Sequence, residues 1–231
     1  MRFEIYKASP NFKLQEGSEF KISDRVRKKY DEYWDIESKL NPHLFDGTLF
    51  YVNEFDSNKV RWVYSKYRYW YAQKNINTES LQGQLTSLAV TGIIKKGNQL
   101  LLGKRSTQVT QDKGLWDFVP SGGISQQQSG KADYYAQLKE EFQEELGVTD
   151  GLISTIEPLI LVLDREDKVL DIVCTLTVKC DLSHFEATNS EYDDFQILNL
   201  SQIEDVEIDQ FSPITQKIIE FIGSQIIKKY L

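Results

Sequence analysis

Cysteine, histidine and net positive charge are all scarce in this 231-residue chain, and each scarcity excludes a class of function. The two cysteines, Cys174 and Cys180, stand six positions apart in an apparent strand, where they share a face but lie too far apart to bridge. The net charge of -8 argues against broad electrostatic binding to nucleic acid. The histidines, His43 and His184, are isolated, and no Ser-His-Asp or Cys-His constellation is visible.

The chain also lacks an apolar run of membrane-spanning length, and residues 1–4 do not begin a signal peptide. With thiols that we expect to be reduced, this predicts a cytoplasmic protein that binds neither membrane nor nucleic acid. The hydrophobic content of 40% and charged content of 27% are ordinary for a globular protein, and the length allows one large domain with an appendage. Monomer and homodimer both remain open.

The composition changes near residue 85. Residues 1–84 are rich in aromatic and mixed-charge residues, and we expect them to form an N-terminal α/β appendage. Its periodicity predicts strands at 2–7, 48–53 and 59–65 and a helix at 24–40. The polar stretch 73–84 is the best candidate for a linker.

Residues 85–231 show strands and helices in mixed order, which predicts an α+β domain with a mixed central sheet and helices on its faces. The expected strands are 87–94, 99–102, 159–163 and 169–179, and the expected helices are 132–146 and 213–229.

The helix expected at 132–146 is the most informative segment. Glu141, Glu144 and Glu145 are spaced by three and four residues and so project from one side of the helix. Its apolar stripe consists of Tyr135, Leu138, Phe142 and Leu146. Glu141 and Glu145 lie just beside this stripe, and Glu144 lies further round. A Glu-rich helix of this kind is ordinarily a solvated surface helix, but like charges so close together also favour a divalent cation such as Mg²⁺, which prefers oxygen ligands.

About twenty residues upstream, segment 116–123 ends in a turn-forming cluster, Pro120, Ser121, Gly122 and Gly123. Glycine in such a turn lets the backbone approach other groups closely. A glycine turn that leads into an acidic helix indicates metal-assisted chemistry on phosphates.

The order of residues in these two segments resembles the box of the Nudix hydrolases, G-x5-E-x7-R-E-U-x-E-E-x-G-U, where U is a bulky apolar residue. The positions in register with its second half are Glu141, Phe142, Glu144, Glu145, Gly147 and Val148. Segment 116–123 is similar to the strand and turn that open the box, here with Ser121 inserted, and segment 101–105 looks like the end of the family's first hairpin. The resemblance covers about residues 85–205 and implies a Nudix-like α/β/α sandwich.

The chain departs from the family pattern at the positions that surround the ligands. From Gly123 to Glu141 it is three residues longer than the family spacing. Glu140 stands at the position of the arginine, and the upstream glutamate position falls on Ala132 or Lys131. In the family these two positions pair and support the metal ligands, so we hypothesise an inverted pair here, Lys131 with Glu140. The ligand positions themselves are intact.

The resemblance implies hydrolysis of a diphosphate that links a nucleoside to another group. Mg²⁺, or Mn²⁺, would be held by three glutamates and a backbone carbonyl, those of Glu141, Glu144, Glu145 and Gly123. Such an ion neutralises diphosphate oxygens and lowers the pKa of a bound water. The expected phosphate contacts are Lys104, Arg105, Gly122 and Gly123, although Lys104 and Arg105 are equally typical of solvated cations at a strand end.

The general base has several candidates. In many relatives a carboxylate on a loop beyond the box takes part, and the residues available here are Asp164, Glu166, Glu186 and Glu191. Each is also typical of a solvated turn, and in some Nudix enzymes a glutamate of the box is the base.

A shorter likeness concerns substrate. Segment 41–47, Asn-Pro-His-Leu-Phe-Asp-Gly, follows the first expected helix and looks like the N-terminal region of the UDP-sugar pyrophosphatase-like branch. It implies a nucleotide diphosphate substrate such as UDP-glucose, cleaved to UMP and a sugar 1-phosphate; alternatively, Leu44, Phe45 and Phe50 only pack the appendage. Two other functions stay open: a Nudix hydrolase of ADP-ribose or a dinucleotide, and a catalytically impaired nucleotide-binding protein.

Overall fold

The computed structural model describes residues 1–17, 22–76, 85–109, 111–125, 130–187, 190–203 and 205–230, the last six of these by their backbone only. The chain forms two compact units, each assembled from three stretches. The first contains Met1–Val90, Gly123–Gln137 and Ile160–Ile172, and the second contains Thr91–Gly122, Leu138–Leu159 and Val173–Leu231. Residues 77–84 lie outside the description, so the domain boundary predicted between 84 and 85 stays a prediction.

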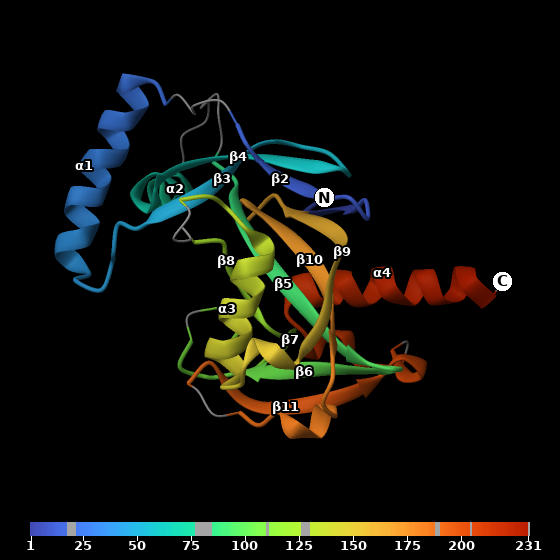
Figure 1. Ribbon diagram of the computed structural model, residues 1–231. Helices are drawn as coiled ribbons and strands as arrows, with labels where there is room; N and C mark the ends of the chain where they lie inside the picture. Colours follow the sequence, from blue (N-terminus) through green and yellow to red (C-terminus); the bar gives the residue numbers. More distant parts are fainter. Residues whose placement is uncertain are drawn as a thin grey trace. The chain divides into compact units, whose positions relative to one another are not determined.

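Five elements, all labelled in Figure 1, contribute residues to both units: strands β5 (Ser87–Lys96), β8 (Ser121–Gly123), β9 (Ile153–Asp164) and β10 (Val169–Val178), and helix α3 (Tyr134–Leu146).

The first unit is built on a mixed sheet with the strand order β1-β9-β10-β5-β3-β4-β2. Its remaining strands are β1 (Phe3–Lys7), β2 (Lys13–Glu16), β3 (Thr48–Phe55) and β4 (Lys59–Lys66). β2 runs parallel to β4, whereas β1 with β9 and β3 with β4 are antiparallel. Tyr51, Val63 and Leu85 form a buried cluster of this unit. The mixed sheet expected from the sequence is therefore confirmed.

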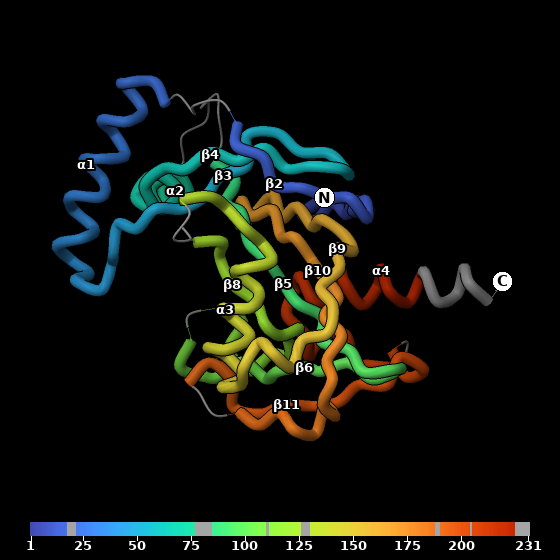
Figure 2. Tube along the Cα trace, in the orientation of Figure 1, coloured from blue at the N-terminus to red at the C-terminus, as the bar shows by residue number. Residues whose placement is uncertain are grey.

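Helices α1 (Asp24–Leu40) and α2 (Tyr67–Asn75) also belong to the first unit, and Figure 2 traces the chain from α1 into β3. The Trp34 ring of α1 meets the Tyr67 and Tyr71 rings of α2 edge-on, with centroids 6.0 and 5.8 Å apart. The predicted linker was wrong at its start, because Gln73 lies inside α2. Its side-chain amide donates to the Leu85 carbonyl at 2.8 Å, and its oxygen accepts the Leu85 N–H at 2.6 Å.

In the second unit, β6 (Gln99–Arg105) pairs with β5, with β7 (Trp116–Phe118) and with β11 (Tyr192–Asn199). The other elements are β8 (Ser121–Gly123), whose last residue belongs to the first unit, helix α4 (Pro213–Tyr230) and 3₁₀ turns at Asp150–Leu152, Leu182–His184, Leu200–Gln202 and Ile208–Gln210. The α+β class is confirmed, and the helices expected at 24–40, 132–146 and 213–229 are present as α1, α3 and α4.

Cys174 is buried and Cys180 half-buried, and neither forms a disulfide in the structure. Among the residues that the structure describes, no helix is long and apolar enough to cross a membrane.

Candidate functional site

Helix α3 sorts its three glutamates by burial. Leu138, Phe142 and Leu146 are buried, as their spacing predicted. Tyr135 was wrongly included in this stripe, because its side chain is 45% exposed. Glu145 beside the stripe is only 2% exposed, Glu141 is half-buried, and Glu144 is exposed.

The ends of α3 are fixed by local hydrogen bonds. The carboxylate of Asp133 accepts the backbone N–H of Tyr135 at 2.9 Å and of Ala136 at 3.1 Å, which is the bonding of a helix N-cap. At the other end the N–H of Gly147 bonds to the Gln143 carbonyl at 3.1 Å, as expected of a residue that closes the last turn.

The Glu141 carboxylate lies against the backbone of the glycine turn. A Cβ on Gly122 would stand 1.9 Å from Glu141 Oε1 and 2.4 Å from its Cδ. Both distances are far inside van der Waals contact, so only glycine allows this approach. The prediction that the turn brings backbone close to another group is met by this carboxylate.

The Glu145 carboxylate is held from two other segments. The backbone N–H of Ser121 donates to its Oε1 and Oε2, at 3.3 and 3.2 Å. The buried hydroxyl of Tyr192 donates to Oε2 at 3.2 Å. Burial raises the pKa of Glu145 well above its ordinary value, the charges of Glu141 and Glu191 raise it further, and the two hydrogen bonds lower it.

Glu191 is the predicted loop carboxylate whose charge acts on Glu145. It is exposed, and its carbonyl accepts the Ser106 N–H at 2.7 Å, which fixes the start of β11 beside β6. Glu186 is also exposed. The charges of Glu141 and Glu191, both of the second unit, therefore act on the buried Glu145.

The other predicted base candidates belong to the first unit and bind a cation. Asp164 accepts three hydrogen bonds from Arg2, from Nε at 3.2 Å to Oδ1 and 3.1 Å to Oδ2, and from Nη2 at 2.8 Å to Oδ2. Asp164 also accepts the backbone N–H groups of Glu166 and Asp167 at 2.9 and 3.1 Å, so it shapes the turn between β9 and β10. Glu166 lies 3.4 Å from Arg2 Nη1.

Lys104 and Arg105 differ in their surroundings, because successive residues of a strand point to opposite faces. The guanidinium carbon of Arg105 stands 5.8 Å from the centre of the Tyr192 ring, and Arg105 Nε donates to the Gln111 carbonyl at 3.3 Å. Lys104 Nζ lies 5.9 Å from the Trp116 ring centre. Arg105 thus adjoins the tyrosine that bonds Glu145, and phosphate binding by either cation remains a prediction.

Two buried residues of the second unit, Asp117 and Tyr192, were not predicted from the sequence to take part in the site. Asp117 is buried and accepts the hydroxyls of Ser212, at 3.0 Å, and of Thr215. Burial raises the pKa of Asp117, whereas the hydrogen bonds from the two hydroxyls and the positive charge of Arg105 lower it by less. The Ser212-Pro213 pair before α4 is a helix-start signal that points to this network. Tyr192 carries no comparable local signal.

The donor set suits a hard divalent cation. Among the described residues, no three His, Cys, Asp or Glu side chains are already drawn together around one ion position. A buried carboxylate next to a second one nevertheless demands compensation by a proton or a cation. The groups at hand are carboxylate oxygens. Such oxygens suit hard cations such as Mg²⁺ and Mn²⁺ better than they suit softer metals.

Gly123 and the Lys131–Glu140 pair stay predictions. Gly123 ends β8, is exposed, and a Cβ there would meet nothing within 4 Å. Lys131 and Glu140 are exposed, and they belong to different units.

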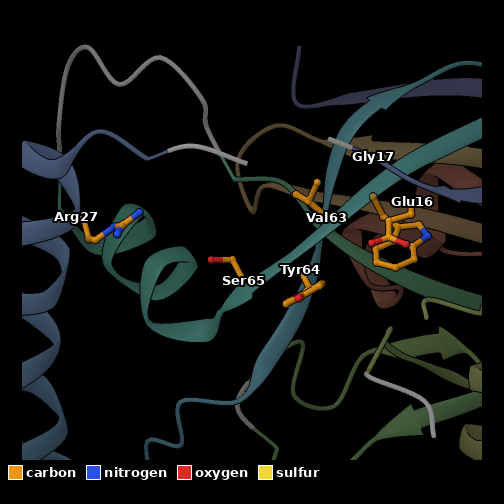
Figure 3. A pocket seen from close by; sticks show the side chains of 7 residues that line it. Glu16, Gly17, Arg27, Val63, Tyr64 and Ser65 are labelled. Atoms are coloured by element: carbon orange, nitrogen blue, oxygen red, sulfur yellow. The ribbon is translucent and has the colours of Figure 1, made fainter. Parts of the chain in front are cut away.

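A pocket of about 380 Å³ lies in the first unit (Figure 3). Arg27 reaches toward it from α1, and Tyr64 and Ser65 line it from β4. None of the predicted site residues lines this pocket, so it lends no support to the phosphate chemistry.

No protein-family model matches the sequence of this chain. No curated protein matches it either. Among solved structures, DR0079 from Deinococcus radiodurans aligns over 77% of this chain and 98% of its own, with 14% identity and a TM-score of 0.50. A MutT protein from Methanosarcina mazei Go1 aligns over 60% of this chain and 93% of its own, with 20% identity and a TM-score of 0.46. A NUDIX hydrolase from Nitrosomonas europaea aligns over 78% of this chain and 88% of its own, with 12% identity and a TM-score of 0.45. At such identities the likeness to DR0079 concerns the fold alone.

Proposed function

We propose that the protein is a divalent-metal-dependent pyrophosphohydrolase of the Nudix type, acting on a nucleoside diphosphate joined to a sugar. One observation carries the proposal: two glutamates of the predicted box, Glu141 and Glu145, converge on the glycine turn that precedes it. Gly122 admits the Glu141 carboxylate, and the neighbouring Ser121 N–H binds Glu145. A solvated surface helix would not bury one of its glutamates against a turn about twenty residues upstream.

Glu141, Glu144 and Glu145 would hold Mg²⁺ or Mn²⁺. The ion supplies charge neutralisation of the diphosphate oxygens and a more acidic water. Arg105 is suited to bind phosphate oxygens bidentately, and Lys104 supplies a second positive charge. The exposed Glu191 is the loop carboxylate available to accept a proton from the attacking water. Water adds to one phosphorus as the bridging P–O bond breaks, which gives a nucleoside monophosphate and a sugar phosphate.

The UDP-sugar assignment rests on segment 41–47 of the first unit. Phe50 is buried and meets the Trp62 ring edge-on at 4.8 Å, so its packing role is accounted for. Phe45 is 81% exposed, which opposes the alternative that it only packs the unit. Asp46 accepts the Arg68 backbone N–H at 2.9 Å and Nε at 2.6 Å, which ties the segment to α2. An aromatic side chain presented beside an anchored turn suits contact with a substrate.

The direct test measures product release from UDP-glucose, ADP-ribose and a dinucleoside polyphosphate, each with Mg²⁺ and with EDTA. Mg²⁺-dependent formation of UMP from UDP-glucose is the expected result. Glu141→Gln and Glu145→Gln should each lower turnover by orders of magnitude, and the exposed Glu157→Gln should not. Hydrolysis of another substrate would reject the UDP-sugar assignment alone. Binding without turnover on every substrate would identify a nucleotide-binding protein instead.

A further inference from the structure

The position of the Glu145 carboxylate depends on a residue 47 positions away in the chain. The Tyr192 hydroxyl donates to Glu145 Oε2 at 3.2 Å, and the tyrosine side chain is only 2% exposed. A buried phenol has one ring orientation available, so its hydroxyl bonds in a fixed direction. A hydrogen bond from such a group restricts the rotamers of a carboxylate far more than a solvated donor would.

Tyr192 is set in place by an irregularity of β11. In the pairing of β11 with β6, Tyr192 stands opposite Arg105 and Asp194 opposite Lys104, so Asp193 is an extra residue. Such a bulge changes the direction of the side chains beside it and is frequent next to active sites. The Tyr192 ring also meets the Phe195 ring, with centroids 5.7 Å apart.

Space for the ring comes from a glycine of β6. A Cβ on Gly103 would stand 2.6 and 2.9 Å from two carbons of the Tyr192 ring and 2.7 Å from Val119. Any larger residue would move the ring or the strand. The bulge and this glycine are two independent features that fix one tyrosine against Glu145.

The geometry points to Tyr192 as a positioning residue of the metal site, which holds the Glu145 carboxylate together with the Ser121 N–H in the orientation that binds the ion. This inference rests on the proposed function and deepens it, because it assigns support of a ligand to a residue outside the acidic helix. Residues that orient metal ligands typically contribute 10- to 100-fold to metal affinity or activity.

The test is Tyr192→Phe, which removes only the hydroxyl, with the exposed Tyr64→Phe as the matched control. Mn²⁺ affinity is measured by calorimetric titration of each protein. Tyr192→Phe should weaken Mn²⁺ binding by about 10- to 100-fold, whereas Tyr64→Phe should bind as the unaltered protein does. Turnover of Tyr192→Phe should recover in part at high Mn²⁺ concentration, at a temperature where the metal-free variant is already fully folded, so that stabilisation of the fold by the ion does not contribute.

A metal-free measurement separates this inference from the proposed function. Denaturation midpoints of Tyr192→Phe, Glu145→Leu and the double variant are compared in EDTA, and the shifts should be non-additive because each single change removes the one hydrogen bond that the two side chains share. Additive shifts, or unchanged Mn²⁺ affinity in Tyr192→Phe, would overturn the positioning role and leave the hydrolase in place. Failure of the unaltered protein to bind Mn²⁺, with the non-additivity intact, would reject the metal site and keep the contact.

Discussion

Glu145→Gln is expected to stabilise the metal-free protein while it removes metal binding. The glutamate carboxylate is buried beside Glu141, and burial and like charge both raise its pKa. Two unit charges about 5 Å apart at an effective dielectric constant of about 20 repel by about 3 kcal/mol. The Ser121 N–H and the Tyr192 hydroxyl offset part of this repulsion, and glutamine retains an oxygen that accepts such bonds. We therefore expect a gain of about 1–3 kcal/mol in the free energy of unfolding at pH 8.

The sign of this effect depends on pH. Because the folded-state pKa of Glu145 is raised, the unfolded chain ionises first as the pH rises. Below the unfolded-state pKa of a glutamate, about 4.3, Glu145 is protonated in both states and its charge does not destabilise the fold. As the pH rises through the folded-state pKa of Glu145, the unaltered protein loses stability relative to Glu145→Gln. Thermal unfolding in EDTA between pH 4 and 9 should show the two proteins together at the acidic end, with Glu145→Gln more stable at pH 8 by roughly 2–10 °C.

The same scan contains its control and its refutation. Glu157→Gln removes an exposed carboxylate of β9 and should follow the unaltered protein at every pH. Added Mn²⁺ should raise the unfolding temperature of the unaltered protein and not that of Glu145→Gln, since a ligand stabilises only the state that binds it. If Glu145→Gln is less stable at pH 8, or differs by a constant amount at all pH values, the carboxylate is not under electrostatic stress and the reasoning fails.

Three further changes test the surroundings of the site. Gly122→Ala should displace the carboxylate that lies against it and abolish Mn²⁺ binding by titration, whereas Gly223→Ala in α4, where a Cβ meets nothing within 4 Å, should not. Asp117→Asn keeps an oxygen for its two hydroxyl donors but cannot ionise. Because the folded pKa of Asp117 is raised, this variant should resist the loss of stability that the unaltered protein shows as the pH rises through that pKa. Replacement of Lys131 and Glu140 by alanine, singly and together, should give activity losses below the sum of the singles if the two pair, and simple additivity would reject the pair.

The acidic helix was predictable because its information is local. Periodicity alone placed Glu145 beside the buried stripe and Glu144 away from it, and the burial of Glu145 and the exposure of Glu144 agree with both placements. The predicted burial of Tyr135 was wrong because this residue lies in the first turn of α3, where its side chain is 45% exposed. Helix α2 was missed because its aromatic and polar residues show weak helical periodicity, and it is packing against Trp34 of α1 that holds it.

The support of the glutamates was not predictable, because it comes from residues distant in the chain. Tyr192 reaches Glu145 through a bulge in β11 and a glycine in β6, and neither has meaning until the two strands pair. Asp117 likewise depends on the approach of α4 to β7. A single sequence therefore specifies which groups carry charge, and the tertiary pairing specifies which of them are held rigidly.

The charges of the site also determine the conditions for substrate binding. A diphosphate is an anion, and it would enter a region where the charges of Glu141 and Glu191 already disfavour an ionised Glu145. Arg105 alone cannot balance these charges, and the net charge of -8 adds no long-range attraction. We therefore expect UDP-glucose to bind measurably in calorimetry only when Mg²⁺ is present, and weakly or not at all in EDTA. Equal binding in EDTA would mean that the diphosphate sits away from the glutamates, and the chemistry proposed for them would then have no substrate to act on.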